Sequence, residues 1–124
     1  SVKDRHTSEV RTSRLCKLLA DQGIHVVCAK LSNAPDVRAW NGKHIPDYYE
    51  VYVKVADPVL EQRDPKGLYR KFALGEVAEV VGKDIPFHEP ESPWLIVENH
   101  ARREIGHVVE EIWRKLQREL SKIE

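Results

Sequence analysis

The sequence has no net charge, only two cysteines and no long apolar run. Twenty basic residues balance twenty acidic residues, which argues against a nucleic-acid partner held by bulk positive charge. Cys16 and Cys28 are too few for a disulfide framework, and each lies in an apolar segment where a buried thiol is expected. No segment is long and apolar enough to span a bilayer and no signal peptide is recognisable, so we expect a cytoplasmic protein without a membrane partner.

The chain does contain enough apolar sequence for a single folded domain. Hydrophobic residues make up 41% of the 124 residues, and charged residues make up 32%. There is no internal repeat, low-complexity tract or interdomain linker. This length and composition predict one domain over residues 1–124.

Three segments have the composition of buried strands. Ile24–Leu31 is a nearly continuous apolar run, as expected for a strand covered on both faces. Tyr48–Val55 is rich in β-branched and aromatic residues, and Trp94–Val97 is a third short apolar run. Helical segments separate these strands, and this alternation predicts a parallel α/β sheet.

The expected helices are marked by apolar periodicity and by capping residues. They cover Asp4–Gln22, Asp36–Asn41, Asp57 to about Asp64, Gly67–Leu74 and Ala101–Ile123. The last helix carries a sustained apolar stripe, which predicts either a core face or a dimer face, the core face being the commoner. The stripe consists of Ile105, Val108, Val109, Ile112, Leu116, Leu120 and Ile123.

A basic segment follows the second predicted strand. Four cations accompany the carboxylate of Asp64, namely Arg63, Lys66, Arg70 and Lys71. A basic helical segment between flexible loops suits a lid that closes over phosphates. We therefore predict a lid over residues 65–93, with solvated surface charge as the alternative reading. Glycines that could act as hinges occur at Gly67, Gly75 and Gly82.

These features, in this order, resemble the C-terminal two-thirds of adenylylsulfate kinases, the P-loop kinases that phosphorylate the ribose 3′-hydroxyl of adenylylsulfate. The resemblance extends from Ser1 to about Asn99. It rests on a helix start, a strand end, both ends of a lid and a last strand: Lys3-Asp4-Arg5, Leu31-Ser32, Gln62–Tyr69, Gly75-Glu76-Val77 and Trp94–Val97.

The resemblance implies a fold, a reaction and ligands. The fold would be P-loop NTPase-like, a parallel sheet with flanking helices in three α/β/α layers. The reaction would be ATP-dependent phosphorylation of a hydroxyl on a nucleotide-activated small anion, such as adenylylsulfate or a related nucleotide. ATP and Mg²⁺ would be the cofactors, a nucleotide would be the substrate, and a homodimer is compatible with the family.

The resemblance also implies roles for five residues. Arg5, Leu31 and Ser32 would lie on the substrate side, with Leu31 lining the base pocket. Lys66 would bind the phosphates or the sulfate of the substrate and act in catalysis, and Arg63 would lie beside the adenine of ATP. Four of them also have an ordinary alternative role: Arg5 could balance the acidic residues near its helix start, Arg63 and Lys66 could be solvated surface charge, and Ser32 could cap the following turn.

Several positions depart from the family pattern. Val80 stands where the family has a lid phenylalanine that stacks on the substrate adenine, and Ser8 and Asn33 replace an asparagine and a proline. Three other sequence segments resemble a divergent subgroup of the family that includes cytidine diphosphoramidate kinases. These segments are Gly23–Cys28, Val37–Asn41 and Val80-Val81-Gly82.

The largest departure is a missing phosphate-binding loop. None of the six glycines lies in a Gly-rich Lys-Ser/Thr motif. The P-loop strand of the complete fold, which lies between the first two predicted strands, is therefore not among these 124 residues. We therefore expect the chain to be a fragment of a longer kinase or a degenerate relative of the family. As it stands, we expect it to have no kinase activity. The alternative function is that of a non-catalytic nucleotide-binding or interaction module. The histidines show no metal-ligand spacing, so we expect no metal site.

Overall fold

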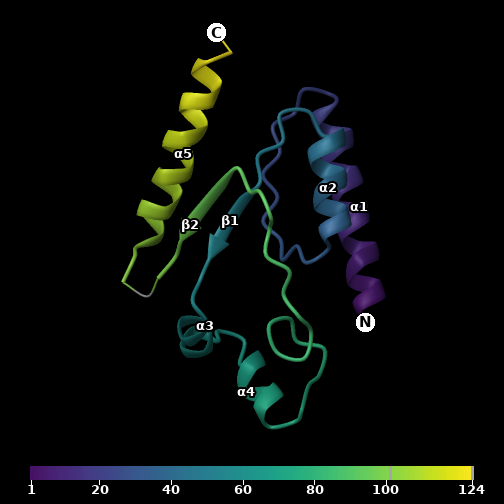
Figure 1. The fold of residues 1–124 in the computed structure, drawn as a ribbon, viewed down its shortest axis with the longest axis vertical. Coiled ribbons are helices and arrows are strands. Elements are labelled where there is room, and N and C mark those ends of the chain that lie inside the picture. The colour runs from purple at the N-terminus through teal and green to yellow at the C-terminus, as the bar shows by residue number, and fades with distance from the viewer. Residues whose placement is uncertain (101, 124) are drawn as a thin grey trace. The chain divides into compact units, whose positions relative to one another are not determined.

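The computed structural model describes residues 1–100 and 102–123. The predicted start of the last helix, Ala101, lies outside the described residues. The chain divides into two compact units, of which the first combines Ser1–Tyr48 with Val77–Pro90 and the second combines Tyr49–Glu76 with Glu91–Glu124. Figure 1 shows the order of the helices and strands along the chain.

The first unit is built on two helices. Helix α1 (Val2–Ala20) starts at a reciprocal capping box between Ser1 and Asp4, where the Ser1 Oγ accepts the Asp4 backbone N–H at 3.2 Å. Helix α2 (Pro35–His44) has proline in its first turn and is longer than predicted, because it continues past Asn41 to His44. The small core of this unit contains the buried side chains of Ala34, Val37 and Val80.

The prediction of a buried strand at Ile24–Leu31 is wrong. Every residue from position 21 to 31 is exposed, and the Val27 side chain is 97% exposed. A strand needs a hydrogen-bonded neighbour, and no described residue forms a β-ladder with this segment. The expectation of buried thiols fails with it, because Cys28 is exposed and Cys16 is only partly buried.

The second unit contains the sheet. Strand β1 (Val51–Lys54) pairs in parallel with β2 (Leu95–Glu98), and Val51 lies opposite Leu95 in the register. Two of the three predicted strands and their parallel direction are therefore confirmed. Val97 of β2 is fully buried and forms the centre of this small core.

Two short helices and one long helix accompany the sheet. Helices α3 (Asp57–Arg63) and α4 (Leu68–Ala73) confirm the predicted helices on either side of the Asp64 turn. Helix α5 (Ile105–Ser121) packs against β2 and buries Val108 there.

The apolar stripe on α5 is only partly core. Val108 is 6% exposed, but Ile105 is 80% exposed, Val109 58% and Leu120 45%. A helix on a two-stranded sheet buries a narrow strip, so beyond Val108 only Ile112 and Leu116 of the stripe are half-buried and its other members are exposed. The prediction of a core face therefore holds for Val108 and fails for most of the other members. No helix within the described ranges has the length and apolarity needed to cross a membrane.

Candidate functional site

A buried carboxylate organises the turn that carries Ser32. Glu9 of α1 is 6% exposed. Its oxygens accept hydrogen bonds from the Ser32 hydroxyl at 3.1 Å, the Asn33 backbone N–H at 3.1 Å and the Ala34 backbone N–H at 3.3 Å. Three donors on one carboxylate hold this turn against α1. Sequence reasoning missed Glu9, although its spacing of four from buried Ser13 marks both residues as one inward helix face.

The same turn is joined to residues 86–89. The Asn33 side-chain amide donates to the Pro86 carbonyl at 2.9 Å, and its oxygen accepts the His88 backbone N–H at 2.8 Å. Arg38 donates to the Ser32 carbonyl at 3.0 Å and to the His88 carbonyl at 2.9 Å. The C-terminal part of the predicted lid is thus hydrogen-bonded into the first unit, whereas its N-terminal part, up to Glu76, belongs to the second unit. The mobility of the lid stays a prediction.

Arg5 is connected to the loop that contains Val80. Its guanidinium donates to the Glu79 carbonyl. In the same loop, the Asp84 carboxylate accepts the backbone N–H groups of Glu79 at 2.7 Å and Val80 at 2.6 Å. Desolvation acts to raise the pKa of Asp84, but these N–H donors and the nearby Arg5 charge outweigh it, so the pKa is lowered. The structure therefore gives Arg5 a defined partner in this loop, away from the acidic residues at the start of its own helix.

Val80 lies at the position where the resemblance would place a stacking phenylalanine. Its side chain is 3% exposed and belongs to the core of the first unit. Leu31, by contrast, is 59% exposed, and Ser32 is partly buried beside Glu9. Arg5 lies one helical turn before Glu9 on α1, so Arg5 and the Ser32 turn share one side of this helix. Within the first unit, the exposed side chain of Leu31 directly precedes the Ser32 turn. The guanidinium of Arg5 comes from the helix to which that turn is hydrogen-bonded.

In the second unit, Asp64 shapes the turn between α3 and α4. Its carboxylate accepts the backbone N–H groups of Tyr69 at 3.2 Å and Arg70 at 3.1 Å, which lie in the first turn of α4. Desolvation acts to raise the pKa of Asp64, but these backbone donors lower it overall. Gly67 adopts a φ of +62°, which favours glycine at this position. Asp64 thus caps helix α4 through backbone N–H groups, and the nearby Arg70 charge also stabilises its ionised form.

The two predicted cations in this turn differ in their contacts. Arg63 donates to the His100 carbonyl at 3.0 Å. Lys66 is exposed, and within residues 1–100 and 102–123 its ammonium makes no hydrogen bond or ion pair. A lysine presented on a capped turn without a carboxylate partner is suited to attract an anionic ligand.

A pair of polar side chains outside the prediction also lies in the first unit. His6 Nε2 is 2.7 Å from Asp36 Oδ2, and this hydrogen bond lowers the pKa of Asp36. Both side chains are largely exposed. Among the residues that the structure describes, no three His, Cys, Asp or Glu side chains gather closely enough to hold a metal ion.

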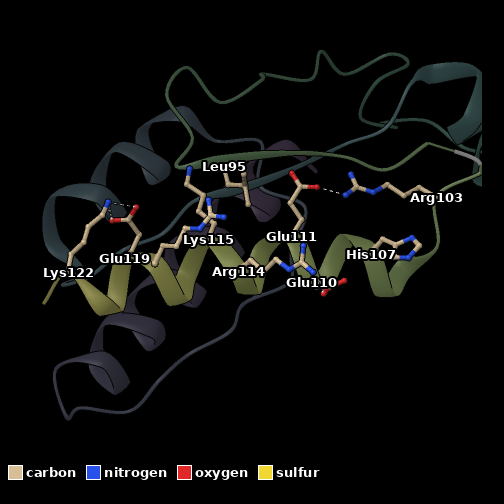
Figure 2. A pocket seen from close by; sticks show the side chains of 10 residues that line it. Leu95, Arg103, His107, Glu110, Glu111, Arg114, Lys115, Glu119 and Lys122 are labelled. Atoms are coloured by element: carbon tan, nitrogen blue, oxygen red, sulfur yellow. Dashed lines mark hydrogen bonds and ion pairs between the residues drawn. The ribbon is translucent and has the colours of Figure 1, made fainter. Parts of the chain in front are cut away.

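A cavity also lies along α5 (Figure 2). It has a volume of about 700 Å³ and contains none of the predicted site residues. Its charged side chains largely satisfy one another, as in the pairs Arg103–Glu111 and Lys122–Glu119. Because a ligand would have to displace these internal pairs, the candidate binding residues are those of the Ser32 turn in the first unit and, separately, those of the Lys66 turn in the second.

The predicted residues therefore fall into two groups. Arg5, Leu31 and Ser32 belong to the first unit, and Arg63 and Lys66 belong to the second. The structure brings together residues within each group, and the two groups lie in different units. Their roles toward a substrate and toward ATP stay predictions.

Comparison with known proteins gives consistent matches. The adenylylsulphate kinase family matches residues 1–98, so α5 lies beyond the matched region. A cytidine diphosphoramidate kinase of Campylobacter jejuni is 36% identical over 107 residues, which are 86% of this chain and 62% of that protein. An adenylyl-sulfate kinase of Clostridium kluyveri is 38% identical over 99 residues, which are 77% of this chain and 48% of that protein.

A solved structure adds the fold. The structure of the Mycobacterium tuberculosis APS kinase CysC in complex with AMPPNP and APS matches with a TM-score of 0.82 and 32% identity, covering 94% of this chain and 69% of that one. The chain thus spans about half to three-fifths of the length of these two curated relatives, 48% in one case and 62% in the other.

Proposed function

The chain belongs to the adenylylsulfate kinase family, and from this we propose that it forms the substrate-binding and lid portion of an ATP-dependent kinase. The proposed reaction transfers the γ-phosphoryl group of ATP to a hydroxyl of a nucleotide-activated small anion. The observation that carries the proposal is the Asp64 turn, which lies inside the matched region and presents Lys66 without an ion-pair partner among the described residues.

The chemistry of phosphoryl transfer explains why such a lysine matters. The transition state spreads negative charge over the equatorial oxygens, and cations that arrive with a closing lid stabilise it while water is excluded. Lys66 is the proposed catalytic cation, and it also binds the phosphates or sulfate of the substrate. Arg63 is the proposed neighbour of ATP, while Arg5, Leu31 and Ser32 are the proposed substrate contacts.

The substrate is proposed to be adenylylsulfate or a related activated nucleotide, and Val80 bears on the choice. Kinases named for adenylyl sulfate and for cytidine diphosphoramidate both resemble the chain at 36–38% identity. A buried valine offers no aromatic face on which an adenine could stack. This favours a related nucleotide over adenylylsulfate. The choice of substrate also decides the pathway, which would be sulfate assimilation for adenylylsulfate or surface polysaccharide modification for the related nucleotide. The cytoplasmic location of the protein stays a prediction.

ATP and Mg²⁺ enter the proposal from the family. The residues of this chain fit them only in part, because the six glycines provide no phosphate-binding loop and the described residues contain no metal-ligand cluster. Lys66 and Arg63 can attract phosphate, but holding the γ-phosphate in line needs consecutive backbone N–H groups and a lysine. We therefore propose that phosphoryl transfer needs a P-loop segment in addition to these 124 residues.

One experiment tests the proposed function directly. The chain and a form that carries a family-type P-loop segment are titrated with adenylylsulfate, cytidine diphosphoramidate and ATP, and both are assayed for ADP release. Substrate-dependent ADP release by the longer form alone supports the proposal. Nucleotide binding without turnover in either form supports the alternative, a non-catalytic nucleotide-binding or interaction module. No binding in either form contradicts both.

A homodimer through α5 is the proposed assembly. Val109, Trp113 and Leu120 are 58%, 53% and 45% exposed, and with Leu116 they follow the 4-3-4 spacing of a coiled-coil seam. The N-terminal half of α5 and its preceding residue carry glutamates, namely Glu104, Glu110 and Glu111. The C-terminal half carries mostly cations, namely Arg114, Lys115 and Arg118, and Lys122 directly follows its end. Antiparallel pairing of two copies would place the acidic half of each helix against the basic half of the other.

A further inference from the structure

The exposed segment at residues 24–31 follows α1 in the opposite direction and is tied to it at two points. Near one end, the Ile24 backbone N–H donates to the Leu19 carbonyl at 3.1 Å. Near the other end, the Lys30 ammonium donates to the Thr12 hydroxyl at 2.9 Å. These contacts fix the register between the segment and the helix. Cys28 lies between the two contact residues of the segment, and Cys16 lies between the two contact residues of the helix.

The tie at Lys30 brings the two cysteines to the same level along the helix. Cys28 lies two residues before Lys30, which is about 6 to 7 Å of extended chain, and Cys16 lies one helical turn, about 6 Å, after Thr12. Burial raises the pKa of Cys16, and the neighbouring Cys28 thiol raises it further, which agrees with the two thiols lying close together. Cys28 is exposed and Cys16 is partly buried, so small oxidants can reach the pair. Because Cys28 is the more exposed thiol, it is the one that a small oxidant reaches first.

We propose that Cys16 and Cys28 are a reversible dithiol–disulfide pair that locks the Ile24–Leu31 segment onto helix α1. The inference is independent of kinase activity. It concerns the segment that leads directly into Leu31 and Ser32, so the bridge would restrict the part of the chain that carries two of the proposed substrate contacts.

The reaction with a small disulfide such as oxidised glutathione is balanced in two exchange steps. The Cys28 thiolate attacks one glutathione sulfur, forms a mixed disulfide and releases one glutathione thiolate. The Cys16 thiolate then attacks the Cys28 sulfur, forms the protein disulfide and releases the second glutathione thiolate. Two protein thiols are oxidised by two electrons, and one glutathione disulfide is reduced to two glutathione thiols.

The test is an equilibrium measurement in glutathione redox buffers. The protein is quenched with acid, and the intramolecular disulfide is quantified by intact mass, as a loss of about 2 Da with no glutathione attached. Trypsin cleaves after Arg14, Lys17 and Lys30, so the bridge joins peptide Leu15–Lys17 to peptide Leu18–Lys30. Since a disordered chain with cysteines so close in sequence can also form this bridge, the same equilibrium constant is measured in denaturing urea.

We expect the equilibrium constant of the folded protein to exceed that in urea by about 10-fold or more, because the fold holds the thiols together. Lys30→Ala removes one tie and should lower the constant toward the urea value. Lys43→Ala, an exposed lysine on α2, should leave it unchanged. Equal constants in buffer and urea would overturn the proposal. So would oxidation only to mixed disulfides or to chains linked to each other, or a Lys30→Ala protein that behaves like the parent.

Discussion

The Ser32 hydroxyl donates to the Glu9 carboxylate across 3.1 Å, and this bond joins the predicted strand end to the first helix. Glu9 is 6% exposed and also accepts the backbone N–H groups of Asn33 and Ala34. A single buried carboxylate thus replaces the β-ladder that the sequence predicts for the preceding segment. The position of Ser32 depends on side-chain hydrogen bonds more than on a sheet.

The first prediction concerns Glu9. Glu9→Ala leaves three donors without an acceptor and should lower the free energy of unfolding by about 1–3 kcal/mol. Glu9→Gln keeps one acceptor oxygen and should cost less. Urea unfolding followed by circular dichroism measures both, with exposed Glu76→Ala as the control. If Glu9→Ala and Glu76→Ala unfold at the same urea concentration, the turn is held by other contacts.

The second prediction concerns Lys66. In a form that carries a P-loop segment, Lys66→Ala should lower kcat by roughly 10- to 100-fold, because it removes a cation that acts mainly on transition-state charge. Lys43→Ala removes an exposed lysine from α2, outside the predicted lid, and should retain nearly the parent kcat. Steady-state ADP release measures both variants. Parent-level kcat and KM in Lys66→Ala would show that Lys66 is misassigned.

The third prediction concerns the Asp84 loop and acid. The folded-state pKa of Asp84 is lowered, so its contribution to stability is present above the unfolded pKa of about 4 and is lost as the pH falls through the lower folded value. The amide protons of Glu79 and Val80 should lose protection from exchange in that acidic range, as measured by NMR after correction for intrinsic exchange. Asp84→Ala should lose this protection at neutral pH too, and Asp84→Asn should retain part of it. Pronounced protection in Asp84→Ala would contradict the assignment.

Part of this fold was predictable because its signals are local. The β-branched content of Val51–Lys54 and the capping acid and proline at Asp57-Pro58 identify β1 and α3 without reference to any distant residue. Arg63 and Lys66 carry no such local signal of function: their proposed roles come from the resemblance of Gln62–Tyr69 to the adenylylsulfate kinase lid, and those roles stay predictions. Residues whose structure depends on neighbours a few positions away are therefore the ones that sequence reasoning finds.

The errors arise where structure depends on a distant partner. Ile24–Leu31 has the composition of a strand, but composition supplies no hydrogen-bonded neighbour, and the described segment is exposed throughout. Val109 belongs to a helical apolar stripe, yet burial of that stripe depends on how much surface lies beside α5. Glu9 was missed because an acidic residue on a helix is usually solvated, and only tertiary structure shows the three donors that surround it.

The fourth prediction concerns the lid. The N-terminal part, residues 65–76, has few buried side chains, whereas residues 79–88 are bonded to Arg5, Asn33 and Arg38. We therefore expect fast hydrogen exchange in residues 65–76, slower exchange in residues 79–88 and the slowest exchange in β1. Exchange followed by mass spectrometry of peptides resolves these ranges. Uniform exchange across residues 65–93, or protection equal to that of β1, would contradict this division.

The last prediction concerns the proposed pairing of α5. Apolar side chains in the middle of a seam contribute most to association, because they are removed from water on both copies. Trp113→Ser should therefore raise the dimer dissociation constant by about 10-fold or more, as measured by sedimentation equilibrium. The matched control is Val27→Ser, which removes an exposed apolar side chain from the first unit, and it should leave the constant unchanged.

The charge pattern adds a second test, since an antiparallel pair brings Glu110 of one copy toward the basic half of the other. Glu110→Lys should weaken the dimer at low salt and lose much of that effect at high salt, where screening reduces the repulsion. A protein that stays monomeric at all concentrations, or a Trp113→Ser protein that associates like the parent, would exclude α5 as the dimer face.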